Sequence, residues 1–97
     1  MKRIRLDPEE RFEQIICAAL HLAEQGHFYY VKMCDVARRA QCSEPLVRYY
    51  LGPAPIMRLR VLREAIRRKN TTVIEQGKRW DLITPKGNLR KRYDEQI

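Results

Sequence analysis

Cysteine and histidine are the side chains of this sequence best suited to nucleophilic, acid–base or metal chemistry. Cys17 and His21 stand four positions apart, so on a helix they would share one face and could meet one metal ion. Two ligands alone do not make a structural zinc site. There is no Cys-x-x-Cys pair, so we expect small, buried or half-buried thiols in a reducing compartment at Cys17, Cys34 and Cys42. His21 and His27 have no evident partner, which favours surface or capping roles.

The patterns that mark many enzymes are missing from the sequence. Gly52 and Gly87 stand alone, so there is no glycine-rich phosphate loop, and neither a His-Glu-x-x-His pair nor a nucleophile elbow is present. No pair of carboxylates is set in an apolar frame that would move their pKa values apart. We therefore expect a protein that is not an enzyme and that needs no metal and no cofactor.

Charge indicates a polyanionic partner instead. The 97 residues include 20 Lys and Arg against 12 Asp and Glu, a net charge of +8. Residues 1–50 hold 8 basic and 7 acidic side chains, a net of +1, whereas residues 51–97 hold 12 and 5, a net of +7. This balance favours nucleic acid first, and an acidic membrane or an acidic protein second. Most of the charge that could attract phosphates therefore follows Leu51.

The stretch between Val31 and Leu51 predicts two short helices joined by a tight turn. The first helix, over Lys32–Ala40, carries small and apolar side chains on one face, namely Met33, Val36, Ala37 and Ala40. Gln41-Cys42 makes the connection, and Ser43 can cap the second helix. In a helix-turn-helix, the first helix braces the second, which lies in the major groove of DNA. Small residues at the crossing and a capped second helix suit that use.

A longer helix is expected before this unit. Asp7 and Pro8 are start signals and Gly26 is a stop signal, which predicts a helix over Pro8–Gln25. The aromatic run His27–Val31 leads from it to the next helix, and several of these rings should pack on the core.

A fourth helix is predicted from near Pro55 to about Glu75, with Gly77 as its stop, because apolar residues recur there at steps of three and four. A short final helix could cover Asn88–Gln96. The apolar face of the fourth helix, with Val73, Ile74 and Trp80, has two interpretations, packing on the first helix or forming the seam of a dimer.

The expected fold class is therefore all-α: a small helical bundle with a helix-turn-helix and a longer fourth helix. We assign residues 1–70 to a helix-turn-helix domain. Residues 71–97 form a basic C-terminal extension that is either part of the same domain or partly flexible. The sequence has no signal peptide and no apolar run of membrane-spanning length, so a cytoplasmic protein with no membrane association is expected.

Six short segments keep a fixed spacing that is more specific than any one of them: Arg11, Ile15–Ala19, Gly26, Val36-Ala37, Ala40–Ser43 and Val47–Leu51. With these residues, the run from Arg11 to about Leu59 resembles the N-terminal DNA-binding domain of the TetR family of bacterial transcription regulators. Those domains read roughly as an Arg, an Ile-Leu-x-Ala-Ala run, a Gly, an Ile-Ala pair, Ala-Gly-Val-Ser and Leu-Tyr-x-His-Phe. The resemblance covers about half the chain.

The resemblance implies a DNA-binding site around the third helix. The residues that would open this recognition helix are Ser43, Glu44, Pro45 and Leu46. The residues that would touch bases and phosphates are Arg48, Tyr49 and Tyr50. Lys32 and Met33 fall where the family often starts the bracing helix with a phosphate-binding Thr. Gly52–Pro55 replaces a segment that usually holds a phosphate-binding Lys, for which Arg58 or Arg60 could substitute.

The sequence departs from the family in two further ways. Gln41 stands where the family has a turn Gly, so this position is expected to be strained or differently turned. Family members also carry a C-terminal domain for ligand sensing and dimerisation, which would begin where this sequence ends. We therefore expect no small-molecule inducer.

Several side chains keep two interpretations. Glu44 can accept a hydrogen bond from a cytosine amino group or can stabilise the start of its helix. One of Tyr49 and Tyr50 should pack inward, and the other should face phosphate. Arg38 and Arg39 form a solvated face, or one of them contacts the DNA backbone. The basic N-terminal residues form a tail or an arm that reaches a minor groove, and they are Lys2, Arg3 and Arg5.

The sequence thus predicts a sequence-specific DNA-binding transcription regulator with double-stranded DNA as its partner. We expect it to act as a homodimeric repressor without a small-molecule ligand. The alternative is a protein-interaction module on a helix-turn-helix scaffold that binds or inhibits another regulator. The near-neutral first half and the proline-rich break after the third helix favour this alternative. An RNA binder is a further alternative, for which no specific motif is present.

Overall fold

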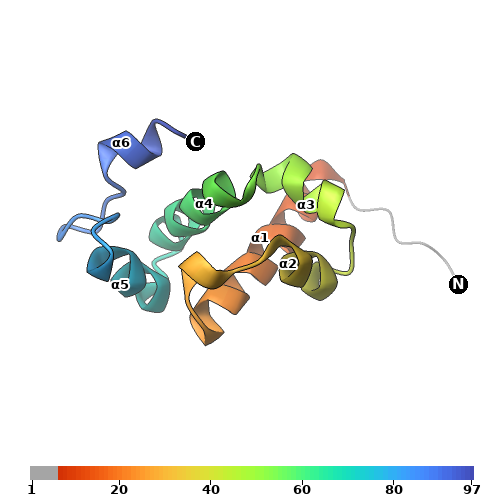
Figure 1. Ribbon diagram of the computed structural model, residues 1–97, viewed down its shortest axis with the longest axis horizontal. Coiled ribbons are helices and arrows are strands. Elements are labelled where there is room, and N and C mark those ends of the chain that lie inside the picture. Colours follow the sequence, from red (N-terminus) through yellow and green to blue (C-terminus); the bar gives the residue numbers. More distant parts are fainter. Residues whose placement is uncertain (1–6) are drawn as a thin grey trace, which may run out of the picture.

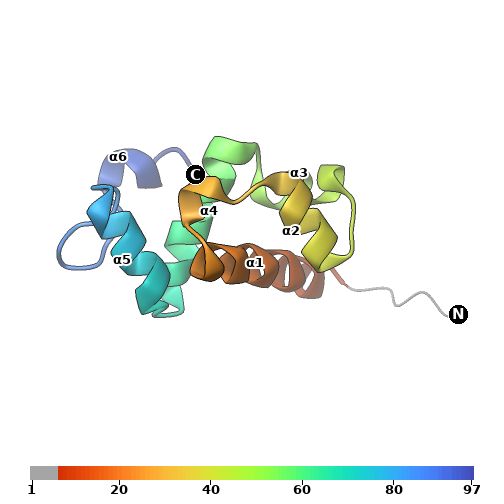
Figure 2. The same cartoon turned by 60° about the horizontal axis from the view of Figure 1, so that its bottom comes forward.

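The described part of the chain, residues 7–97 of a computed structural model, is an all-α helical bundle (Figure 1). Its elements are α1 (Pro8–Gln25), the 3₁₀ turn η1 (Phe28–Tyr30), α2 (Met33–Ala40), α3 (Glu44–Leu51), α4 (Ala54–Arg67), α5 (Thr71–Arg79) and α6 (Lys91–Asp94). Helices α2 and α3 lie at one end of the molecule and α5 and α6 at the other, in both views (Figures 1 and 2). The predicted fold class, an all-α small helical bundle, is confirmed.

Helix α1 begins and ends where the sequence predicts. The Asp7 carboxylate accepts a hydrogen bond from the backbone N–H of Glu10 at 2.8 Å, and Pro8 occupies the first turn, where no N–H is needed. At the other end, Gly26 donates its N–H to the carbonyl of Leu22 at 3.0 Å. The face buried against the other helices is formed by Ile15, Ile16, Ala18, Ala19, Leu20 and Ala23.

The turn between α2 and α3 is closed by a left-handed residue. Gln41 has φ 56° and ψ 48°, and the N–H of Cys42 reaches back to the carbonyl of Ala37 at 2.9 Å. Gln41 therefore adopts a left-handed conformation that a glycine would adopt freely, at the energetic cost that a Cβ brings there. Ser43 then caps α3, because its Oγ accepts from the N–H of Leu46 at 3.3 Å.

The predicted single helix from Pro55 to Glu75 is wrong. It is broken at 68–70 into α4 and α5: Lys69 takes a positive φ of 57°, and the N–H of Asn70 bonds to the carbonyl of Ala65 at 2.8 Å. Asn70 also caps α5, since its Oδ1 accepts from the N–H of Val73 at 3.3 Å. The apolar stripe continues across the break, which is why periodicity alone misses it.

Gly77 is not the helix stop that the sequence predicts but a buried residue inside α5. A Cβ built there would lie 2.5 Å from Cδ1 of Ile83, so the glycine allows the segment after α5 to fold back closely. That segment makes an isolated antiparallel bridge between Ile83 and Leu89 and ends in α6, which is shorter than the predicted Asn88–Gln96.

One core joins both parts of the chain. The largest fully buried side chains include Phe28 of η1, Met57 and Leu62 of α4, and Val73 and Ile83 of the C-terminal part. The buried side chains of residues 71–97 thus share one core with those of the helices before them. Of the three apolar residues with two interpretations, Val73 is part of this core and Ile74 packs against it, whereas Trp80 is 41% exposed.

Among the helices of residues 7–97, none has the length and the apolar character needed to cross a membrane.

The prediction of buried or half-buried thiols is wrong for two of the three cysteines. Cys17 and Cys34 are exposed, and Cys42 is half-buried. Cys17 lies on the side of α1 that meets polar groups of α4, where its thiol donates to Glu13 at 3.2 Å and accepts from Arg68 at 3.4 Å. Although the residue reaches solvent, desolvation of its sulfur and the hydrogen bond to Glu13 raise the pKa of the thiol. A raised pKa does not suit a nucleophile.

Candidate nucleic-acid interface

Helix α3 has one buried side and one exposed side. Val47 and Leu51 are fully buried, whereas Arg48 and Tyr49 are exposed, with 80% of Tyr49 accessible. Tyr50 is half-buried and packs against the core, with its ring edge-on to that of Tyr49 at 5.1 Å. The prediction that one of these tyrosines packs inward is confirmed for Tyr50. The side of α3 that carries Arg48 and Tyr49 therefore faces solvent.

The first turn of α3 is also open to solvent. Ser43, Glu44 and Pro45 are exposed, and Leu46 is half-buried against the core. The unpaired N–H groups and the positive end of the helix dipole at such a start attract anions, phosphate included. Glu44 lies in the same first turn, where a carboxylate complements the dipole.

Helix α2 braces α3 through small side chains. The two helices are in contact, and Ala37 and Ala40 of α2 are 4% and 2% exposed. Lys32 caps the start of α2 with its backbone only, and its side chain is exposed. Helix α2 begins at Met33, next to the predicted start near Lys32. Of the predicted face, Val36, Ala37 and Ala40 are buried and Met33 is half-buried against the core.

The exposed cations near α3 are largely uncommitted. No hydrogen bond or ion pair joins the side chains of Lys32 and Arg48 to other residues of the described part. Arg38 approaches Asp35 at 3.9 Å, but both side chains are well exposed, so this pair contributes little. The predicted N-terminal arm of Lys2, Arg3 and Arg5 lies outside the described residues.

Arg58 has a neighbour that the sequence did not suggest. Its guanidinium carbon lies over the ring of Tyr29, 4.7 Å from the ring centre. The Nε atoms of Arg58 and Arg60 are buried and lack hydrogen-bond partners within the described chain. Of the predicted site residues, Arg58 therefore lies against η1. Those from Glu44 to Tyr50 lie in α3, and Ser43 caps this helix.

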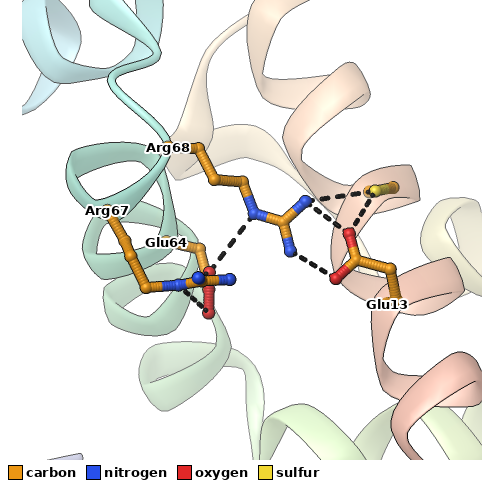
Figure 3. Close-up of polar contacts among 5 residues, drawn as sticks. Glu13, Glu64, Arg67 and Arg68 are labelled. Carbon is orange, nitrogen blue, oxygen red and sulfur yellow. Dashed lines mark hydrogen bonds and ion pairs between the residues drawn. The ribbon is translucent and has the colours of Figure 1, made fainter.

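An ion-pair cluster at the end of α4 engages Arg67 and Arg68 (Figure 3). Arg68 donates two hydrogen bonds to the carboxylate of Glu13 in α1, at 2.6 and 2.8 Å, and a third to Glu64 at 3.3 Å. Arg67 binds Glu64 at 2.9 Å. Hydrogen bonds from Arg68 hold the pKa of Glu13 below its usual value. Residues 55 positions apart cannot be paired from sequence spacing, so this cluster was missed.

Aromatic rings gather where η1 meets the end of α5. His27, Tyr29 and Trp80 form consecutive neighbours, with ring centres 4.8 Å apart for His27 and Trp80 and 4.6 Å for Trp80 and Tyr29. His27 caps η1, since its Nδ1 accepts from the N–H of Tyr29 at 3.2 Å, which confirms a capping role. Phe28 is buried beneath. The aromatic run after Gly26 was the only sequence signal for this cluster.

Cys17 and His21 lie on one face of α1, as predicted, and both line a pocket of ≈ 290 Å³ between α1 and the end of α2. Gln14 and Arg39 also line this pocket. Within residues 7–97, no group of three or more His, Cys, Asp or Glu side chains is arranged to hold a metal ion. The pocket therefore offers two of the ligands that a metal would need.

No protein-family model, curated protein or solved structure matches this chain.

Proposed function

We propose that this protein is a sequence-specific DNA-binding transcription regulator built on a TetR-like helix-turn-helix. The observation that carries the proposal is α3 itself: a helix capped by Ser43, anchored by Val47 and Leu51, and exposing Arg48 and Tyr49. A helix with this division can enter a major groove while its buried side stays in the core. The net charge of +8 supplies the attraction to phosphate that any such protein needs.

In this proposal the exposed residues divide into those that read bases and those that bind phosphate. Arg48 donates to the O6 and N7 atoms of a guanine, the commonest specific contact in the major groove. The start of α3, the Tyr49 hydroxyl and Lys32 bind phosphates and fix the position of the helix on the duplex. Glu44 accepts from a cytosine amino group or serves its helix start.

Regulation would follow from occupancy of a promoter. We propose a two-fold homodimer in the cytoplasm, with two recognition helices about one DNA turn apart, roughly 34 Å, acting as a repressor without a small-molecule inducer. Val73 and Ile74 pack in the chain's own core, so the dimer seam would be formed by other residues.

The proposal is tested by selecting binding sites from a pool of random duplexes with the wild type and with Arg48→Ala. The wild type should enrich a two-fold symmetric motif. Arg48→Ala should lose the preference at one position of each half-site and keep weak, salt-sensitive binding. Arg63→Ala is the matched control, because Arg63 is exposed on α4 with no partner among the described residues. Failure of the wild type to enrich any motif would refute sequence-specific recognition.

A protein-interaction module remains the second candidate, because one observation favours it. Three of the four large hydrophobic side chains that are exposed in the described chain, Tyr29, Tyr30 and Trp80, lie together and away from the recognition helix.

A further inference from the structure

The aromatic patch, defined as His27, Tyr29, Tyr30 and Trp80, keeps much of its surface in contact with water. Tyr29 is 43% exposed, Tyr30 68% and Trp80 41%. Large aromatic side chains gain stability by burial, and such rings are normally exposed one at a time. A group of them at one place is typical of a surface that binds another molecule.

Arg58 adds an unpaired positive charge to this patch. Its guanidinium lies on the ring of Tyr29, and its Nε is buried without an acceptor. The remainder of the guanidinium makes no hydrogen bond or ion pair with residues 7–97. Buried N–H groups are nearly always paired in folded proteins, and the exceptions call for an explanation. Stacking on Tyr29 also fixes the side chain, so a bound anion would not have to order it.

We propose that the aromatic patch and Arg58 form a docking surface for an acidic segment of a partner protein, separate from the DNA-reading face of α3. A carboxylate of the segment pairs with Arg58, and apolar side chains cover Tyr30 and Trp80. Tyrosine, tryptophan and arginine are the residues that dominate binding energy at protein interfaces. This inference does not depend on the proposed DNA-binding function.

A single-stranded nucleic acid fits this surface less well. Bases stack on open ring faces along a basic groove. Here Tyr29 already has Trp80 and Arg58 as ring neighbours, and Trp80 already has His27 and Tyr29. Two cations of α5 and the segment after it are also paired within the chain, since Lys78 pairs with Glu75 at 3.5 Å and Arg90 with Asp81.

A second copy of the chain also fits less well. Two copies related by a two-fold axis would bring the same patch together, and each Arg58 would then need a carboxylate from the other patch. The nearest acids in sequence to Trp80, Glu75 and Asp81, are already paired with Lys78 and Arg90.

The test is selection of random dodecapeptides displayed on phage against the full chain. Enriched peptides are then synthesised with a fluorescent label, and their affinity is measured by anisotropy. We expect peptides that combine Asp or Glu with apolar side chains. Arg58→Met, which keeps an apolar stem, and Tyr30→Ala, at the most exposed ring of the patch, should each weaken binding about tenfold or more. Arg63→Met and Arg48→Ala should leave it unchanged.

Circular dichroism establishes that each variant is folded, and three results would overturn the proposal. The first is the absence of any enriched acidic peptide, or peptide binding that Arg58→Met and Tyr30→Ala leave intact. The second is a dimer, seen by sedimentation, that Tyr30→Ala dissociates, which would assign the patch to a second copy. The third is tight binding of labelled oligo-dT that Arg58→Met abolishes, which would assign it to nucleic acid. Duplex selection with Arg48→Ala reads the DNA-binding function separately.

Discussion

The ion-pair cluster of Figure 3 yields the most detailed prediction, the effect of Arg68→Met. Arg68 follows the last residue of α4, and it makes a two-bond contact with Glu13 in the middle of α1. Its side chain is 24% exposed, against 53% for Glu13 and 14% for Glu64. The substitution keeps the apolar stem but removes the only contact described here between Glu13 and a basic side chain.

The magnitude follows from the number of bonds and their exposure. A hydrogen bond to a charged group contributes about 1.5–3 kcal/mol when it is shielded from water, and an exposed ion pair about 0.2–1 kcal/mol. Glu13 is half open to solvent, whereas Glu64 is mostly buried and keeps Arg67 as a partner. We therefore expect Arg68→Met to lower the free energy of unfolding by about 1–2 kcal/mol, which for a chain of this length lowers Tm by roughly 5–15 °C.

Urea unfolding followed by circular dichroism measures this loss, and Arg67→Met is the matched control. Arg67 is 64% exposed and pairs only within α4, so its removal should cost about 0.5 kcal/mol or less. Because Arg68 lowers the folded-state pKa of Glu13 below its ordinary value of 4.5, the stabilisation is present above that pH and is lost as pH falls through the lowered value. Equal losses for the two variants at neutral pH, or a difference that persists in strong acid, would refute the reasoning.

Three further changes test other parts of the fold by urea unfolding. Gln41→Gly should raise the free energy of unfolding by about 0.5–1 kcal/mol, since relief of the left-handed conformation exceeds the entropy that Gly loses; an unchanged midpoint would contradict it. Gly77→Ala should lower it by about 1–3 kcal/mol through the clash with Ile83, and adding Ile83→Val should recover part of this; additive losses would argue against the clash. Burial lowers the folded-state pKa of His27 below 6.5, so the unfolded chain takes up a proton more readily than the folded chain, and the wild type should lose stability as pH falls below about 6.5. His27→Asn keeps an acceptor for the cap of η1 but does not titrate, so it should not show this loss. Parallel pH profiles of the two proteins would refute this.

Local signals predicted the first half of the fold well. Asp7, Pro8 and Gly26 set the ends of α1, and Ser43 set the start of α3, because capping depends on residues within one turn of the helix end. The buried face of α2 followed from helical periodicity. Even the unusual turn at Gln41 was indicated by its departure from a glycine, although sequence alone left its conformation open.

The second half was predicted less well, because long-range packing decides it. Asn70 is a good cap, but the apolar stripe runs on through it, and the break becomes evident only with the left-handed Lys69 before it. Gly77 read as a stop, yet its missing side chain is needed for contact with Ile83. The placement of Arg58 on Tyr29 joins residues far apart in the sequence, so no spacing rule finds it.

The central claim is tested most directly by fluorescence anisotropy, with labelled DNA from immediately upstream of the protein's own gene, a scrambled duplex of equal length, and salt raised from low to physiological concentration. A sequence-specific regulator should prefer the upstream duplex, keep that preference at physiological salt, and lose it with Arg48→Ala while Arg63→Ala behaves as the wild type. Weak and equal binding to both duplexes that collapses steeply with salt would contradict the claim, because it would mean that the net charge of +8 alone attracts the DNA.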